Sequence, residues 1–169
     1  MKSLVITDRH LSLDQFKHSV LVDLNNIDCM TCTGGLYCLK HESKCRLNDD
    51  MSCLYNWMCD AKLTIVISHI VYGTFDEPIL RLAERDIANF EPYFSVVEEK
   101  SMRLSLSNIK RKLIVVGYGD MTEEDEENLR NYMSATAIFG YEPNNIHLYL
   151  CQEEEIEETL KAFGGVDLG

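Results

Sequence analysis

The chain alternates between two hydrophobic patterns. Short runs rich in β-branched residues indicate buried strands, and such near-continuous apolar strands are typical of a parallel sheet covered on both faces. These runs are Ser3–Thr7, Ser19–Leu24, Leu63–Ser68, Leu113–Gly117 and Ile146–Leu150. The segments between them place apolar residues at helical spacing. We expect helices over Met51–Cys59, Glu77–Ala88, Glu123–Phe139 and Glu153–Phe163.

Three local signals support the boundaries of these helices. The acidic pair before Met51 suits a helix N-terminus electrostatically. Thr122, followed by Asp125, can cap the third helix in the manner of a capping box. Two glycines, Gly164 and Gly165, end the last helix.

Strands that alternate with helices predict one doubly wound α/β domain spanning residues 1–169. Right-handed crossovers favour five parallel strands in the order 2-1-3-4-5. A ligand of such a sheet binds beyond the carboxyl ends of the strands, where the strand order reverses. The loops to inspect are therefore Thr7–Ser12, Ser68–Phe75 and Gly117–Met121.

Composition and charge indicate the cellular compartment of the protein and exclude some classes of binding partner. The net charge of −12 argues against binding to DNA, RNA or acidic membrane surfaces, because phosphate groups attract basic faces. Seven cysteines, an odd number, favour a reducing compartment over a secreted disulfide framework. No apolar run approaches the length of a membrane span, and the stretch Met1–Ile6 is too short for a signal peptide. We therefore expect a cytoplasmic protein.

The first loop offers donors for an anion. Thr7, Arg9 and Ser12 place a hydroxyl, a guanidinium and a hydroxyl where a phosphate could accept charge-assisted hydrogen bonds. This stretch resembles the Ser-x-Arg-x-x-Ser loop that wraps the FMN phosphate in the flavodoxin-like NAD(P)H-dependent FMN reductases and iron–sulfur flavoproteins.

The middle of the chain carries the resemblance further. A cysteine-rich loop leads into Cys45-Arg46-Leu47-Asn48-Asp49-Asp50-Met51, then a strand, and then Ser68-His69-Ile70-Val71-Tyr72-Gly73-Thr74 before a helix that ends Glu84-Arg85. The order is similar to that family over about residues 25–120, and Glu91-Pro92-Tyr93-Phe94 also looks like a family segment.

The resemblance implies an FMN-dependent NAD(P)H oxidoreductase, and family members are often homodimers. NAD(P)H would be the co-substrate, and flavin and nicotinamide nucleotide would be the small-molecule partners. No protein acid or base is required, because the flavin carries the chemistry, so we assign no catalytic residue. The implied flavin-binding residues are Thr7, Arg9, Ser12, Ser68, His69, Ile70, Val71, Tyr72, Gly73, Gly117, Tyr118 and Gly119.

Two features of these loops have alternative interpretations. His69 replaces the family's proline in the loop that borders the flavin ring, and it could stack there with Tyr72 or be a hydrogen-bonded residue at a strand end. Gly117 and Gly119 could let the backbone approach a ligand closely, or could form an ordinary strand-to-helix turn.

The first crossover is short. Only residues 8–18 connect the first two strands, close to the minimum of about 10–12 residues that a parallel crossover needs. A helix from Asp14 to His18 can have at most about a turn, because a helix advances only ~1.5 Å per residue. The helix N-terminus that usually supports a phosphate is therefore lost. We expect FMN to bind weakly and to depend heavily on Arg9.

Four cysteines, Cys29, Cys32, Cys38 and Cys45, follow the second strand. Four thiolates can ligate an iron–sulfur cluster or a tetrahedral zinc. The gap between Cys32 and Cys38 is wider than the family's cluster spacing, so reduced thiols lining a loop are favoured over either metal site.

Three classes of function are compatible with these observations. The first is a flavin-dependent oxidoreductase, and the second is an electron carrier with an added cluster. The third is a flavodoxin-like module that has lost FMN and acts through its surfaces, which the short crossover supports.

Overall fold

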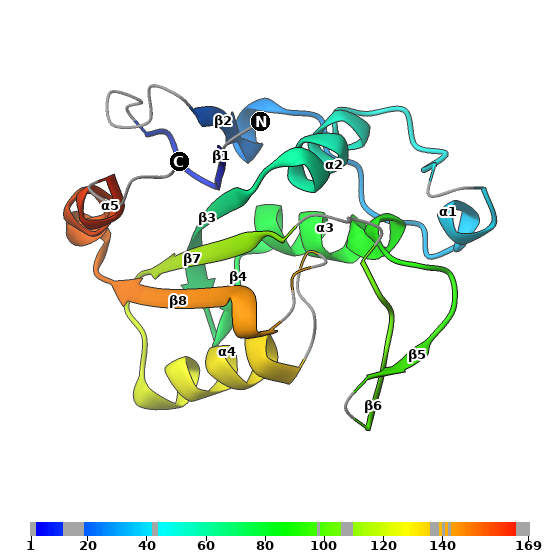
Figure 1. Ribbon diagram of the computed structural model, residues 1–169. Coiled ribbons are helices and arrows are strands. Elements are labelled where there is room, and N and C mark those ends of the chain that lie inside the picture. Colours follow the sequence, from blue (N-terminus) through cyan, green and yellow to red (C-terminus); the bar gives the residue numbers. More distant parts are fainter. Residues whose placement is uncertain are drawn as a thin grey trace.

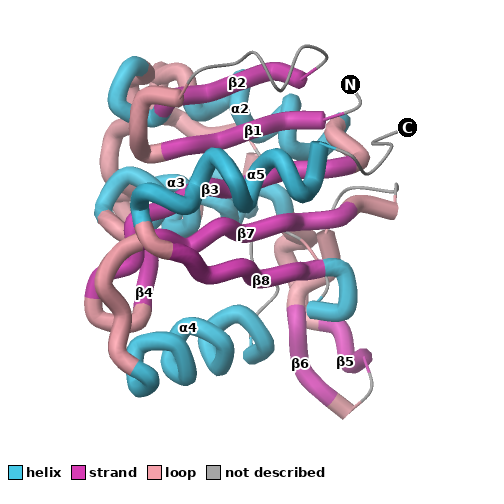
Figure 2. Tube along the Cα trace, turned by 90° about the vertical axis from the view of Figure 1, so that its left-hand side faces the viewer, coloured by secondary structure: helices cyan, strands magenta, loops and turns pink. Residues whose placement is uncertain are grey.

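The computed structural model describes residues 3–11, 19–41, 44–97, 99–105, 110–135, 139, 141 and 143–164. Its principal sheet runs in the order β2-β1-β3-β7-β8, with all of these neighbours parallel. The strands are β1 (Ser3–Thr7), β2 (Ser19–Asp23), β3 (Leu63–Val71), β7 (Lys112–Tyr118) and β8 (Ile146–Cys151). The predicted flavodoxin-like order 2-1-3-4-5 is confirmed (Figures 1 and 2).

Side chains that alternate along the strands lie in two hydrophobic cores, one on each face of the sheet. Leu4 and Ile6 of β1 face one core, whereas Val5 between them faces the other. The first core packs against α2 (Met51–Asp60), α3 (Glu77–Arg85) and α4 (Glu123–Ala135). The second packs against α5 (Ile156–Gly164), which crosses the opposite face of the sheet in Figure 2.

The predicted helices differ from the observed ones mainly at their ends. The second ends at Arg85, and Asp86–Asn89 continues as a 3-10 helix. The last begins with a 3-10 turn, Glu153–Glu155, before α5. The Thr122–Asp125 capping box forms as predicted, with Asp125 N donating to Thr122 Oγ1 at 3.2 Å.

Several short elements were not predicted. They are the helix α1 (Tyr37–Lys40), the strand β4 (Thr74–Phe75), and a separate hairpin of β5 (Ser95–Val97) and β6 (Lys100–Met102). Strand β4 pairs antiparallel with β3. The hairpin extends away from the sheet in Figure 1. No helix in the described part of the chain is long and apolar enough to cross a membrane.

The connection between β1 and β2 has the predicted shortness, because β1 ends at Thr7 and β2 begins at Ser19. The two strands are paired in register, Ser3 with Ser19 and Thr7 with Asp23, so β2 begins level with the start of β1. The segment Asp14–His18, where a helix of at most about a turn was expected, lies outside the described residues.

Candidate functional site

The carboxyl ends of β1, β3 and β7 form the point at which the strand order reverses. Thr7 is paired with Ile67, and His69 is paired with Tyr118, so the residues that follow these positions converge. Asp8, His69 and Tyr118 are the polar residues at this junction. They come from segments far apart in the sequence and form one connected cluster.

Asp8 lies at the centre of the cluster. Its Oδ2 accepts the backbone N–H of His69 at 2.7 Å, and its Oδ1 accepts the hydroxyl of Tyr118 at 2.9 Å. Burial raises the pKa of the Asp8 carboxyl above its usual value, while these two hydrogen bonds act in the opposite direction. Burial and the adjacent Asp8 carboxylate both raise the pKa of Tyr118, which keeps its hydroxyl a donor.

The ring of His69 is oriented by its neighbours. Its Nδ1 lies 3.4 Å from Asp76 Oδ2, and its ring lies 5.4 Å from that of Tyr118. Gly119, at φ +124°, brings its backbone so close that an added Cβ would lie 2.8 Å from His69 Cδ2. The side chain is 43% exposed, so one edge remains open to a ligand.

Arg9 is balanced by an internal acid. Its Nη1 lies 2.9 Å from Glu153 Oε1, and its guanidinium lies 5.3 Å from the centre of the Tyr118 ring. Thr7, which is fully buried, closes a tight turn in which its Oγ1 accepts the N–H of Arg9 at 3.1 Å. The hydroxyl predicted to meet a phosphate thus bonds within the chain, and the cation is paired in charge with Glu153, while the buried Nη1 of Arg9 makes no hydrogen bond.

The described residues of this loop do not fit an FMN phosphate. The donors that converge here are satisfied by the Asp8 carboxylate, and the charge of Arg9 is balanced by Glu153. A phosphate dianion would meet two carboxylates at this position. Ser12, the remaining predicted donor, lies outside the described residues.

The predicted ring loop is a tight hairpin. Ile70 and Val71 belong to β3 and pair with Phe75 and Thr74 of β4, and the turn between them has φ +51° at Tyr72 and +71° at Gly73. These values are typical of a two-residue type I′ turn.

The turn packs against α4 at Gly73 and leaves Tyr72 in solvent. An added Cβ at Gly73 would lie 2.8 Å from Asn128 Cβ. Tyr72 is 93% exposed at the tip of the hairpin.

A groove of about 400 Å³ lies beside this hairpin. Its walls come from the hairpin, from α3 between Glu77 and Glu84, and from Thr31 of the loop after β2. Asp76, the partner of His69, also lines it, so the groove is adjacent to the cluster around Asp8. The groove is lined by Thr31, Val71, Tyr72, Thr74, Phe75, Asp76, Glu77, Leu80, Arg81 and Glu84.

Several predicted site residues point into the fold. Ser68 and Ile70 are buried, and Ser68 Oγ donates to the carbonyl of His69 at 3.0 Å. Gly117 makes room for Ile70 and Leu150, because an added Cβ would lie 2.8 Å from a side-chain carbon of each. Of the predicted residues, Ser68, His69 and Tyr118 hydrogen-bond the Asp8 carboxyl. Arg9 lies over the ring of Tyr118, and Gly119 lies against His69.

Sequence reasoning missed the acidic residues of the site. Asp8, Asp76 and Glu153 complete the cluster, and each has a recognisable position in the sequence. Asp8 directly follows a buried strand. Asp76 precedes the Glu-Pro pair that begins α3, where its Oδ1 accepts Glu77 N at 2.7 Å. Glu153 begins the acidic run that follows β8.

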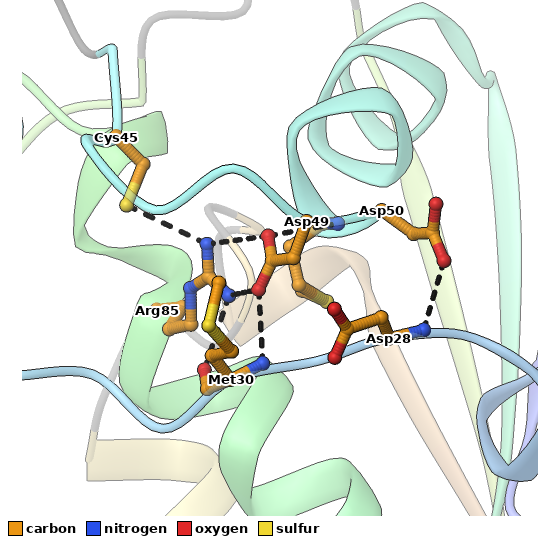
Figure 3. Close-up of polar contacts among 7 residues, drawn as sticks. Asp28, Met30, Cys45, Asp49, Asp50 and Arg85 are labelled. Atoms are coloured by element: carbon orange, nitrogen blue, oxygen red, sulfur yellow. Dashed lines mark hydrogen bonds and ion pairs between the residues drawn. The ribbon is translucent and has the colours of Figure 1, made fainter.

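A second polar cluster joins the cysteine-rich loop to α3 (Figure 3). Arg85 pairs with Asp49, Nη2 donating to Oδ1 at 2.9 Å, and both side chains are almost fully buried. Arg85 Nη1 also donates to the carbonyl of Met30 at 3.0 Å, and Asp49 Oδ2 accepts the N–H of Met30 at 2.9 Å. Burial is the largest single effect on Asp49 and opposes its ionisation, but the hydrogen bonds from Arg85, Met30 and Met51, together with the charge of Arg85, outweigh burial and lower the carboxyl pKa.

Two cysteines, Cys29 and Cys45, lie beside this pair. Cys45 Sγ accepts from Arg85 Nη2 at 3.5 Å, and all seven cysteines are free thiols. Burial raises the pKa of Cys29 and of Cys38, the former against the opposing effect of Arg85. Within the described ranges, no three Cys, His, Asp or Glu side chains are placed to bind a metal ion. That aerobically purified protein carries no stoichiometric metal stays a prediction.

Comparisons with known proteins identify structures but no sequence relatives. No family model and no curated protein matches the chain. The fold is similar to an NAD(P)H:quinone oxidoreductase from Methanothermobacter marburgensis, with a TM-score of 0.66, 16% identity and 98% of each chain covered.

An FMN-dependent NADH-azoreductase from Bacillus anthracis, solved with FMN, is also similar. Its TM-score is 0.57 at 12% identity, covering 96% of this chain and 93% of that one. Another azoreductase from the same species has a TM-score of 0.59 at 10% identity, covering 98% and 96%. At these identities, the likeness shows the fold.

Proposed function

We propose that this chain is a flavodoxin-like, flavin-dependent NAD(P)H oxidoreductase that binds the flavin ring beside His69. The observation that supports this most is the position of an oriented, half-exposed imidazole where the strand order reverses. It stands beside Tyr118 and next to a groove of about 400 Å³. Ligands of doubly wound sheets bind at this position.

His69 and Tyr118 would bind the ring system by stacking and edge contacts, while Gly119 lets the backbone approach without a side chain. Asp76 orients the imidazole through the 3.4 Å contact with Nδ1. A bound flavin supplies hydride transfer between a nicotinamide nucleotide and an acceptor. The chain's own residues then have to bind and orient, so no acid or base is assigned.

The likeness to quinone reductases and azoreductases supports this proposal, because they share the fold over nearly the whole chain. The same reasoning proposes a single domain, NAD(P)H as the reductant, a cytoplasmic setting and a homodimer. Light scattering on the purified protein measures the last of these.

A test of the proposed function is NADH or NADPH oxidation in the presence of riboflavin, FMN or a quinone. His69→Ala should lower turnover at least about tenfold, the effect of losing one oriented contact of roughly 1.4 kcal/mol. The matched control is His147→Ala. His147 is exposed and lies near the amino end of β8, whereas the candidate site lies at the carboxyl ends of the strands. No oxidation with any flavin or acceptor would contradict the proposal.

The second candidate function is that of a flavodoxin-like module that has lost FMN and acts through its surfaces. It is favoured by the Arg9–Glu153 pair, which balances the charge of the cation, and by the two internal bonds to Asp8, which occupy the His69 amide and the Tyr118 hydroxyl. The two candidates are separated by a binding titration with riboflavin. Saturable binding supports the oxidoreductase, and no binding at millimolar flavin supports the module.

A further inference from the structure

We propose that this site selects a flavin without its 5′-phosphate, such as riboflavin, over FMN, and that Asp8 and Glu153 determine the selection. This inference rests on the proposed function, because it concerns which flavin the site takes. It starts from the two carboxylates that lie where the phosphate end of a flavin would reach the first loop.

Asp8 provides an acceptor where a phosphate requires donors. The amide of His69 and the hydroxyl of Tyr118 both donate to its carboxylate, at 2.7 and 2.9 Å. Neither donor can turn to a phosphate without leaving a partly buried carboxylate unsatisfied. These contacts join the ends of β1, β3 and β7, so the fold itself opposes such an exchange.

Glu153 removes the second requirement, a free cation. Its Oε1 lies 2.9 Å from Arg9 Nη1, and the guanidinium is also stacked against Tyr118. The Glu153 side chain is 61% exposed, so the pair faces the solvent from which a ligand would approach. A dianion would meet Glu153 together with Arg9, and the carboxylate cancels the attraction.

A sugar-alcohol chain has the opposite chemistry. The ribityl hydroxyls of riboflavin are donors as well as acceptors, and the chain carries no charge. A carboxylate has about four lone-pair sites, and the hydrogen bonds from His69, Tyr118 and Ser68 leave Asp8 about one of them. Asp8 and Glu153 can therefore accept hydrogen bonds from ribityl hydroxyls, whereas they repel a phosphate.

The experiment compares riboflavin and FMN by quenching of flavin fluorescence on the full chain. Wild-type protein should bind riboflavin at least about tenfold more tightly than FMN, since the two ligands differ only by a repelled charge. Glu153→Gln releases Arg9 and should strengthen FMN binding at least about threefold, with riboflavin affinity changed less than about twofold.

Glu154→Gln is the matched control. It makes the same charge change on the neighbouring residue, outside the Arg9 pair, so the affinities for both flavins should stay within about twofold of wild type. Because Glu153 is exposed, the variant should fold, and circular dichroism checks this.

The possible failures are distinguishable. FMN binding as tight as riboflavin in the wild type would overturn this inference and leave the proposed function standing. An equal response of FMN to both variants would overturn the assignment to Glu153. Failure of both flavins to bind at millimolar concentration would overturn the proposed function, and the inference with it.

Discussion

The buried pair of Arg85 and Asp49 gives the sharpest stability prediction. Arg85→Met keeps most of the side-chain volume but removes the guanidinium from a carboxylate that is 0% exposed. Removing one partner of such a pair leaves an uncompensated buried charge, which costs about 3–5 kcal/mol. Met30 N and Met51 N still donate to Asp49, at 2.9 and 3.3 Å, so we expect about 3 kcal/mol.

The assay is urea unfolding followed by circular dichroism at neutral pH. Arg81→Met is the control on the same helix, since Arg81 pairs with Glu77 in solvent, the two side chains being 41% and 71% exposed. An exposed pair of this kind contributes little to stability, because solvent screens its charges. A loss below about 1 kcal/mol in Arg85→Met, or losses of equal size in both variants, would refute the reasoning.

The pH dependence provides an independent check. The pKa of Asp49 is lowered in the folded wild type, so its contribution to stability is present above its unfolded pKa and is lost as pH falls through the folded value. Without Arg85, burial favours the protonated acid. The difference in unfolding free energy between wild type and Arg85→Met should therefore shrink as pH falls from 7 toward about 4.

Three further predictions concern the turn and the site. Gly73→Ala should lower the free energy of unfolding more than Gly34→Ala does, because both positions have positive φ but only Gly73 is crowded by α4. Thermal unfolding should show a loss of about 1 kcal/mol for Gly34→Ala and about 2–4 kcal/mol for Gly73→Ala. Tyr118→Phe removes the hydroxyl that Asp8 accepts, so urea unfolding should show a loss of about 1–3 kcal/mol. The loss should be larger at pH 7 than at pH 4, because a carboxylate accepts a stronger hydrogen bond than a protonated acid does. Tyr72→Ala should leave stability within about 0.5 kcal/mol, because this ring is exposed, while riboflavin affinity measured by fluorescence should fall by about 1–3 kcal/mol if the ring stacks on flavin; an unchanged affinity would remove Tyr72 from the site.

The order of the strands could be predicted from the sequence because buried parallel strands are marked strongly. Ser3–Thr7 and Leu63–Ser68 are almost uninterrupted apolar or β-branched runs, and right-handed crossovers leave few orders for them. Elements of two to four residues, such as β4 and α1, carry no such pattern. The turn at Tyr72 and Gly73 was also not predicted. A tyrosine at positive φ is uncommon, and Gly73 alone does not specify a hairpin.

The candidate site could be predicted only by location. The loops after β1, β3 and β7 lie together because the predicted strand order is correct, and their role as a ligand site stays a prediction. The roles of residues within the first loop depend on pairing that the sequence does not reveal. Arg9 looked available for a phosphate because Glu153, its partner, lies far along the chain. Asp8 was overlooked because an acid after a strand has no meaning until His69 and Tyr118 are seen to donate to it.

The central claim is that a flavin ring binds beside His69 at the carboxyl ends of the central strands. The most direct measurement is a titration of ¹⁵N-labelled protein with riboflavin, followed by amide chemical shifts. We expect saturable shifts concentrated at His69, Tyr118 and Gly119 and along the wall of the adjacent groove. Shifts confined to the β5–β6 hairpin, or no shifts at millimolar riboflavin, would contradict it.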